Sequence, residues 1–283
     1  MSTETNEIMT FRTGQSLFGV PIQNVLSIMG ESDKLFCKAF KSKDALGIME
    51  YRGTPVAVLD LARAGNITSD SDAKLELVEI LNDREQDHIN WLDTLEKSLV
   101  DNEAFTLAKD PHKCKFGLWY DAFETDDEDL KEILVDFDEP HKKIHALADE
   151  LLGMKDNGEL AKALEQLNYE KDTTLAKLRS TFARAVNQLK STIKPVFIYL
   201  TLDGATPCAA LRVDEIADVQ AANNDDFVAM SDMALPQVNE MDYIKGFLKL
   251  GEKGDCLLLD VATLTNQTAT VSSDNETEQA KSA

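Results

Sequence analysis

The period of the hydrophobic pattern changes twice along the chain, and this change constrains the fold more than any other feature. Up to about residue 61, and again from 196 onward, short runs of apolar residues alternate with polar ones between turns, which is typical of β-strands. Between about 73 and 193, apolar residues recur every three or four positions, which is typical of packed helices. A helical segment inserted into one β-domain explains this order more simply than three separate domains.

The two flanking segments predict several strands each. The first should form a hairpin around Gly14, followed by strands at 45–51 and 54–61 that are separated by a two-residue turn. Strands resume at 196–202 and 208–213. The flanks therefore predict a β-rich fold that is divided in sequence.

The middle segment predicts several helices. A first helix carries an apolar stripe at Leu77, Ile80, His88, Trp91, Leu95 and Leu99. Pro140 is expected at the first position of a later helix, which would place His141 and His145 on one side of it. A last long helix is expected over 160–193, where the apolar residues have core-facing or coiled-coil spacing.

Composition excludes several classes of partner. The net charge of −22 argues against nucleic acid and against anionic membrane surfaces, because both are bound by basic patches. No apolar run approaches the roughly 20 residues that span a bilayer. The acidic, polar first residues do not resemble a signal peptide, and we expect a cytoplasmic protein. In that reducing compartment, cysteines are expected to be thiols or metal ligands.

The four histidines all lie between residues 88 and 145, together with one cysteine. Thiolate and neutral imidazole are ligands that Zn²⁺ prefers, and a set of four completes a tetrahedral site. A pair such as His141 and His145 is by itself more often a surface or capping pair. With His88 and Cys114 the pattern predicts a zinc site, whereas His112 is interpreted as a solvated loop residue.

The flanks resemble the two halves of a CheW-like coupling domain, the adaptor of bacterial chemotaxis arrays. The resemblance rests on Gly-Ile-Met-Glu-Tyr-Arg-Gly at 47–53, on Pro-Val-Ala-Val-Leu-Asp-Leu at 55–61 and on Leu-Arg-Val-Asp-Glu-Ile-Ala-Asp-Val at 211–219. It implies adaptor halves at 8–66 and 195–265. Residues 266–283, which are polar and small, are expected to form a disordered tail.

The insert, 73–193, resembles the chemoreceptor zinc-binding domain. The matching positions are His88 and Trp91, then Cys114, Phe116, Gly117 and Trp119, then His141 and His145. The resemblance implies that His88, Cys114, His141 and His145 hold zinc, with the two tryptophans packing around them. The expected fold class is therefore multidomain α+β, with a pair of small β-barrel subdomains interrupted by an inserted α-helical bundle.

The resemblances also imply partners. A CheW-like adaptor is expected to bind chemoreceptor signalling tips and a CheA-type histidine kinase, and to have no enzymatic activity. The receptor-binding role is carried onto Val25, Gly47 and Arg52, although Glu50 and Tyr51 replace the usual Asn-Leu. Homodimerisation through the helical insert is expected as well.

The purpose of the zinc site leaves alternatives open. Oxidation of Cys114 would weaken its bond to the metal. The resemblance to the chemoreceptor zinc-binding domain implies that the site senses oxidants, including hypochlorous acid, or else zinc itself. The alternative is a constitutive array scaffold in which zinc is purely structural. A zinc hydrolase would need an open coordination position and a general base, which the motif does not supply.

Overall fold

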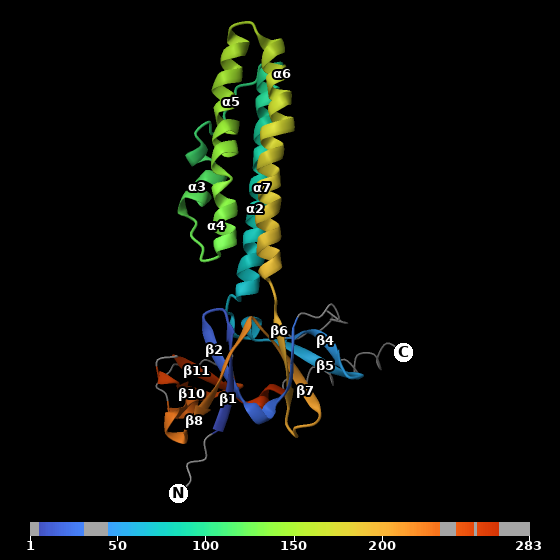
Figure 1. Cartoon of the computed structure of the whole chain (residues 1–283), viewed down its shortest axis with the longest axis vertical. Helices are drawn as coiled ribbons and strands as arrows, with labels where there is room; N and C mark the ends of the chain where they lie inside the picture. The colour runs from blue at the N-terminus through green and yellow to red at the C-terminus, as the bar shows by residue number, and fades with distance from the viewer. Residues whose placement is uncertain (1–5, 31–44, 233–241, 252–253, 266–283) are drawn as a thin grey trace, which may run out of the picture. The chain divides into compact units, whose positions relative to one another are not determined.

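The computed structural model describes residues 6–30, 45–232, 242–251 and 254–265, and the chain divides into two compact units (Figure 1). The sheet unit comprises Met1–Ala73 and Lys194–Ala283. The helical unit comprises Lys74–Ile193. Each unit has its own hydrophobic core, as expected of parts that bury their apolar faces separately.

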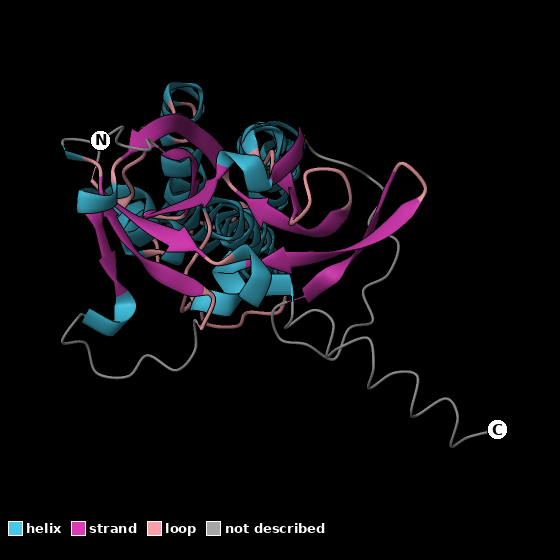
Figure 2. Ribbon diagram, turned by 90° about the horizontal axis from the view of Figure 1, so that it is seen from below, coloured by secondary structure: helices cyan, strands magenta, loops and turns pink. Residues whose placement is uncertain are grey.

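Among the described residues, the sheet unit contains a six-stranded and a five-stranded sheet. The six-stranded sheet has the order β8 (Glu215–Ala222), β1 (Asn6–Thr13), β2 (Ser16–Pro21), β11 (Asp255–Leu259), β10 (Ile244–Lys249) and β9 (Phe227–Ala229). The five-stranded sheet has the order β3 (Val25–Met29), β6 (Val196–Thr201), β7 (Pro207–Val213), β5 (Thr54–Asp60) and β4 (Ala45–Tyr51). Figure 2 shows these strands in magenta.

Both sheets combine strands from the two flanking segments. In the first sheet β1 pairs with β8, and β2 pairs with β11 in parallel. In the second, β5 lies parallel to β7, with Val58 opposite Ala210. A shared core that includes Phe11, Phe18, Leu200 and Leu211 joins strands from both flanks. The two flanks therefore form one fold, and neither could bury its apolar residues alone.

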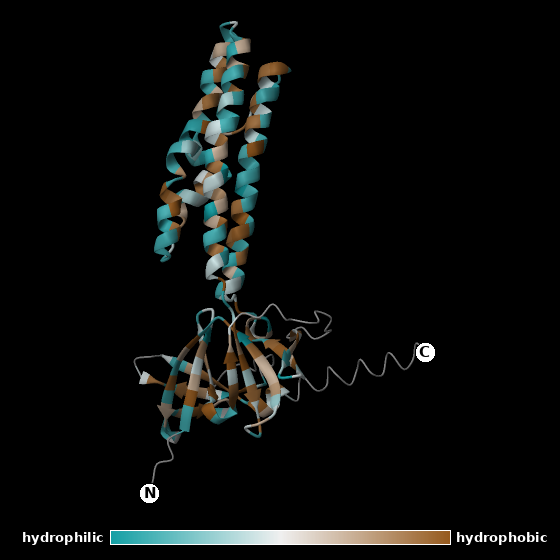
Figure 3. Cartoon of the chain, turned by 45° about the vertical axis from the view of Figure 1, so that its right-hand side comes forward, coloured by the Kyte–Doolittle hydropathy of each residue, from teal (hydrophilic) through white to brown (hydrophobic). Residues whose placement is uncertain are grey.

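The helical unit is built on three long helical stretches. Its helices are α2 (Asp70–Val100), α3 (Lys115–Ala122), α4 (Glu128–Val135), α5 (Asp138–Asp156), α6 (Leu160–Glu170) and α7 (Ala176–Thr192), of which α2 starts in the sheet unit. A π-helical turn, Lys171–Leu175, joins α6 to α7. Figure 1 shows α2, α5 and α7 side by side, and Figure 3 shows hydrophobic residues recurring along each of them. Their buried residues form one core, as amphipathic helices require.

Two helix boundaries differ from the prediction. The helix α5 begins at Asp138, two residues before Pro140, and the backbone N–H of His141 donates to the carbonyl of Phe137. Proline is tolerated there because N–H groups of a first turn need no partner within the helix. The predicted single helix over 160–193 contains the π turn, which periodicity does not reveal.

The expected fold class is confirmed: the chain is α+β, with a helical segment between two sheet-forming segments. The predicted tail, 266–283, lies outside the described residues. None of the described helices combines the length and the apolar character that a membrane span requires.

Candidate metal centre

Four side chains from three helices meet in the helical unit. His88 comes from α2, Cys114 caps the start of α3, and His141 and His145 come from α5. One donor atom from each lies within 4.8 Å of the others, and Cys114 Sγ is 3.2 Å from His141 Nε2. The three imidazoles are 3%, 4% and 1% exposed. The structure thus brings together the four residues that the sequence indicated.

Two of the histidines present a buried nitrogen without a partner. His88 Nδ1 lies 2.7 Å from the carbonyl oxygen of Arg84, and His145 Nδ1 lies 3.0 Å from that of Ala108. A carbonyl can only accept, so these nitrogens carry the proton and each Nε2 carries a lone pair. Both Nε2 atoms are buried with no hydrogen-bond partner. Such atoms are costly to bury, and a metal ion bound between them would satisfy them.

The backbone around Cys114 aims its sulfur at the histidines. Cys114 is the N-cap of α3, and its Sγ accepts a hydrogen bond from the Gly117 N–H at 3.1 Å. A Cβ atom at Gly117 would lie 1.8 Å from the carbonyl oxygen of Pro111. Glycine is therefore required there, which gives the Cys-x-x-Gly spacing a steric reason.

Burial sets the protonation of the four groups. Desolvation, together with the smaller effect of the neighbouring His88, lowers the pKa of His141 to about 3 and that of His145 to about 4. Desolvation also lowers the pKa of His88. Burial raises the pKa of the Cys114 thiol, against the hydrogen bonds from the Gly117 and Phe116 N–H groups. The histidines are therefore neutral near pH 7, the form that binds metals, and a cation is what would favour the thiolate.

Aromatic rings enclose the cluster. Phe116 is 1% exposed, and its ring centroid lies 4.9 Å from that of His141 and 5.6 Å from that of His88. The ring of Trp91 lies 5.0 Å from that of His145, and its Nε1 donates to the Ala108 carbonyl at 2.8 Å. Apolar walls of this kind limit the access of water to a metal site.

A cavity of about 370 Å³ borders the cluster on one side. It is lined by Cys114, His88, His145 and the exposed lysines Lys113 and Lys115, among others. Cys114 is only partly buried, whereas the three histidines are buried. A small molecule would therefore meet the sulfur more readily than it would meet the imidazoles.

Comparison with protein families assigns both parts of the chain. Residues 7–93 match the family model of the CheW-like domain, and residues 88–152 match that of the chemoreceptor zinc-binding domain. The chain thus contains a match to each of these two domains, and neither match covers half of the chain. All four clustered side chains lie within the zinc-binding match, whereas the CheW-like match stops before the second flank, which the structure pairs with the first.

A search of solved structures matches the crystal structure of the scaffolding protein TtCheW from Thermoanaerobacter tengcongensis. The match covers 90% of this chain and 88% of that one, at 10% sequence identity and a TM-score of 0.38. No curated protein matches the chain.

The sheet unit places the predicted receptor-binding residues on two strands and a turn. Val25 begins β3 and Gly47 lies on β4, and these strands are the two outer ones in the order of the five-stranded sheet. Arg52 lies in the turn between β4 and β5, with its guanidinium 5.3 Å from the centre of the Tyr51 ring. Tyr51 in turn packs against Tyr199 at 4.7 Å between centroids. The role of the three residues in binding stays a prediction.

Sequence reasoning misses the groups that orient the ligands of the zinc-binding domain. The carbonyls of Arg84 and Ala108 fix two imidazoles, but every residue offers a carbonyl, so no sequence signal marks them. His112, by contrast, is placed outside the cluster, where its exposed ring lies 2.8 Å from the Asp121 carboxylate.

Proposed function

We propose that this protein is a chemotaxis adaptor that couples chemoreceptor signalling tips to a CheA-type histidine kinase, and that its helical unit holds one zinc ion. His88, Cys114, His141 and His145 would be the ligands. The observation that carries the zinc site is the pair of buried Nε2 atoms without partners, beside a thiol and a third imidazole. The matches to the CheW-like and zinc-binding domains support the adaptor role.

The residues of the site prepare it for a metal ion before one arrives. Arg84 and Ala108 hold two imidazoles with Nε2 inward, and Gly117 holds the Cys114 sulfur at the start of α3. Zinc, when bound, supplies charge that favours the thiolate and binding energy that stabilises the fold. Since α2, α3 and α5 each contribute a ligand, the site would hold the three helices together.

We further propose that Cys114 makes the site responsive to oxidants. Its thiolate would attack hypochlorous acid, forming a sulfur–oxygen bond in the sulfenic acid while chloride leaves; sulfur loses two electrons and chlorine gains them. Support comes from the bordering cavity and from the partial exposure of Cys114, which the buried histidines do not share. A sulfenic acid is a poorer ligand than a thiolate, so oxidation would loosen the link between α3 and the other helices.

A constitutive scaffold with a structural zinc site is the second candidate. It is favoured by the burial of all three histidines, because a closed site with four protein ligands is usually structural. The two candidates differ in what oxidation does: a sensor changes kinase coupling at a dose that leaves the protein folded, whereas a structural site changes it only on unfolding.

The proposed homodimer would use the surface of the helical unit. Large apolar side chains are exposed there, including Leu118, Val135 and Tyr169 at 62%, 71% and 62% exposure. Sedimentation of the purified protein would test the dimer. We also propose a cytoplasmic location, where chemoreceptor tips and their kinases assemble.

The decisive experiment measures zinc per chain by elemental analysis in the wild type, Cys114→Ala and His112→Ala. We expect about one zinc in the wild type and in His112→Ala, and a weak, substoichiometric content in Cys114→Ala. Hypochlorous acid should then release zinc from the wild type in step with Cys114 oxidation, followed by mass spectrometry. Wild-type protein without zinc would overturn the site assignment.

Kinase assays separate the two candidates. Receptor-stimulated kinase activity is measured with wild-type and Cys114→Ala adaptor, before and after a dose of oxidant that leaves both folded. A sensor predicts a change in the wild type only. Equal activity in all four samples would rule out the redox switch and leave the structural candidate.

A further inference from the structure

The first turn of α2 is capped by a carboxylate that lies more than 140 residues away in sequence. Asp214 Oδ2 accepts from the Asp70 N–H at 3.0 Å, and Oδ1 accepts from the Ser71 N–H at 3.4 Å and from its hydroxyl at 3.2 Å. The separation in sequence is 144 and 143 residues. The first N–H groups of a helix have no partner within it, and a negative charge at this end is favourable.

The same carboxylate also holds a turn of the first flank. Asp214 Oδ2 accepts from the Gly14 N–H at 2.8 Å, in the turn between β1 and β2. The Asp214 N–H donates to the carbonyl of Arg12 at 3.0 Å. A Cβ at Gly14 would lie 2.3 Å from the carbonyl oxygen of Thr68, two residues before α2. The turn, the β7–β8 corner and the start of α2 are thus packed together, and we call these contacts of Asp214 the α2 latch.

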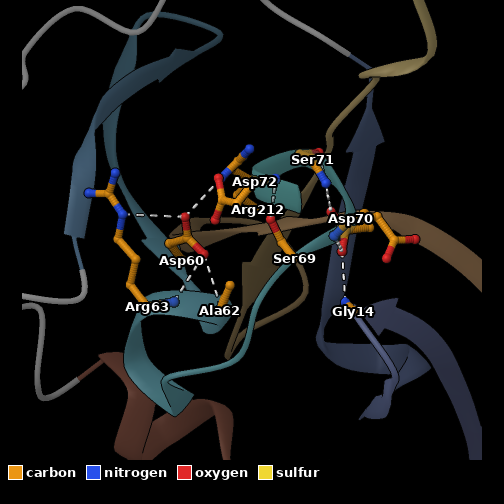
Figure 4. A network of polar contacts seen from close by, with 10 residues as sticks. Gly14, Asp60, Ala62, Arg63, Ser69, Asp70, Ser71, Asp72 and Arg212 are labelled. Carbon is orange, nitrogen blue, oxygen red and sulfur yellow. Dashed lines mark hydrogen bonds and ion pairs between the residues drawn. The ribbon is translucent and has the colours of Figure 1, made fainter. Parts of the chain in front are cut away.

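Ion pairs of Arg212 lie beside the latch (Figure 4). Arg212 pairs with Asp60 at 3.0 Å and lies 3.9 Å from Asp72 in the first turn of α2. The Asp60 side chain is 2% exposed, and its other oxygen accepts from the Ala62 N–H at 3.0 Å, at the start of the short helix α1 (Leu61–Gly65). The ends of β5 and β7 therefore meet through a buried ion pair, and Arg212 extends it to the partly exposed Asp72 at the start of α2.

The end of the helical segment is bonded differently. The Thr192 and Ser191 hydroxyls donate to carbonyls of α7 itself, those of Leu189 and Gln188, at 2.8 Å each. Pro195 follows shortly after, and it has no N–H to donate. One distant side chain reaches this end, since Lys74 Nζ donates to the Thr192 carbonyl at 3.5 Å. The start of α2 has a local cap, in which Ser69 Oγ accepts from the Asp72 N–H at 3.0 Å, and in addition the bonds that the distant Asp214 carboxylate accepts.

We propose that Asp214 is the residue through which the state of the metal centre reaches the CheW-like domain. This inference rests on the proposed zinc site. The helix α2 is continuous from Asp70 to Val100 and carries His88 about five turns from the latch. A helix moves as a stiff element, so a displacement at His88 is passed to its first turn. There, four hydrogen bonds to one carboxylate transfer it to the β1–β2 turn and the β7–β8 corner.

Hydrogen–deuterium exchange of the full chain tests this coupling, with zinc and after chelation. The variants are Asp214→Ala and, as matched control, Glu215→Ala, which removes the neighbouring carboxylate whose side chain is 62% exposed and pairs with Arg12 at 3.5 Å. In the wild type and the control, chelation should raise exchange in the helical unit and also at 12–16 and 207–216. In Asp214→Ala the response of the helical unit should remain, while the response at 12–16 and 207–216 disappears.

The remaining outcomes are separable. A response at 12–16 and 207–216 that persists in folded Asp214→Ala overturns the latch and leaves the zinc site standing. Absence of bound zinc in the wild type overturns the zinc site, and the latch proposal with it. If Asp214→Ala fails to fold, Ser71→Ala serves instead, since it removes only one hydrogen bond of the four. It should raise exchange at the start of α2 about threefold to fivefold and weaken the zinc response, and an undiminished response would overturn the proposal.

Discussion

The metal centre and the α2 latch both gather polar side chains, but they differ in whether those side chains satisfy one another. In the latch, the Asp214 carboxylate accepts from backbone N–H groups, and beside it the Asp60 carboxylate accepts from the Ala62 N–H and pairs with Arg212. In the metal centre, His88 and His145 each leave a buried Nε2 without a partner. The first cluster is complete with protein atoms alone, and the second is not.

This difference has a physical meaning. A buried polar atom without a hydrogen bond costs roughly 1–3 kcal/mol, so a fold retains such atoms where something else satisfies them. A complete network holds elements together, whereas an incomplete one with soft donors is suited to a metal ion. The comparison predicts that added zinc stabilises the helical unit strongly and that the sheet unit depends on its internal charge pairs.

The largest expected effect is that of zinc on the stability of the helical unit. Both tryptophans of the chain, Trp91 and Trp119, lie in this unit, so their fluorescence reports its unfolding. At free zinc a thousandfold above the dissociation constant, we expect a stabilisation of about 4 kcal/mol in the wild type. His145→Ala should lose most of it, as read from the urea midpoint with and without zinc.

The control for that measurement is His112→Ala, which removes an exposed imidazole outside the cluster. It should keep the full response to zinc. If His145→Ala gained as much stability from zinc as His112→Ala, the metal would be bound elsewhere. The proposal that zinc completes the cluster of His88, Cys114, His141 and His145 would then be wrong.

The next largest effect is expected from loss of the ion pair between Asp60 and Arg212. Arg212→Met should destabilise the sheet unit by about 3 kcal/mol, because it removes the closer cation of the buried Asp60 carboxylate and leaves only Arg63, which is 55% exposed and 3.8 Å away. Labelling of Cys256, which is 0% exposed, reports the opening of this unit when its peptide is followed by mass spectrometry. The double variant Asp60→Asn with Arg212→Met should recover part of the loss. No recovery would mean that the packing of the Arg212 side chain, rather than its charge, stabilises the sheet unit.

A glycine pair tests the steric argument at the metal centre. Gly117→Ala should cost about 2–3 kcal/mol and weaken zinc binding, because its Cβ would meet the Pro111 carbonyl and displace Cys114. Gly153→Ala is the matched control in α5, where a Cβ meets nothing within 4 Å, and it should stabilise by about 0.5–1 kcal/mol. Urea unfolding by tryptophan fluorescence measures both, and equal effects would remove the steric reason for Gly117.

Much of the fold could be predicted from the sequence because the spacing of the apolar residues differs between strands and helices. Alternation marked β4 and β5 on both sides of Arg52, and a three-to-four spacing marked α2 through His88 and Trp91. The start of α5 and the π turn at 171–175 were placed wrongly or missed, since an early proline and one extra residue in a turn leave the apolar stripe nearly unchanged. The short strand β9 (Phe227–Ala229) was missed because three residues show no period.

The ligands of the metal centre could be predicted from the sequence, whereas the role of Asp214 in the latch could not. The four ligands have side chains that bind metals and stand at characteristic spacings, so sequence indicates them as a set. Asp214 is one acidic residue among 51, and nothing near it in sequence shows that it caps a helix starting at Asp70. Contacts of this kind depend on how β7 returns beside β5, which only the three-dimensional fold establishes.

The smallest expected effect is the pH dependence of the free energy of unfolding in the zinc-free protein. In the zinc-free protein, burial lowers the pKa of His141 to about 3 and that of His145 to about 4, from the ordinary 6.5. Above pH 6.5 these imidazoles are neutral whether the chain is folded or unfolded. Below it, the unfolded chain binds protons that the folded helical unit excludes, so the free energy of unfolding falls as pH decreases toward 4.

At pH 5.5 the expected loss is about 2 kcal/mol relative to pH 7.5, measured as the urea midpoint of tryptophan fluorescence in chelator. His141→Gln should show roughly half the loss, since one of the two strongly shifted groups is gone, whereas His112→Ala should show all of it. The same drop in His141→Gln as in the wild type would mean that other groups cause the pH dependence. In that case water would reach the buried imidazoles and could bond the nitrogens that have no protein partner. The polar groups of the metal centre would then be satisfied without a metal ion, as those of the latch are.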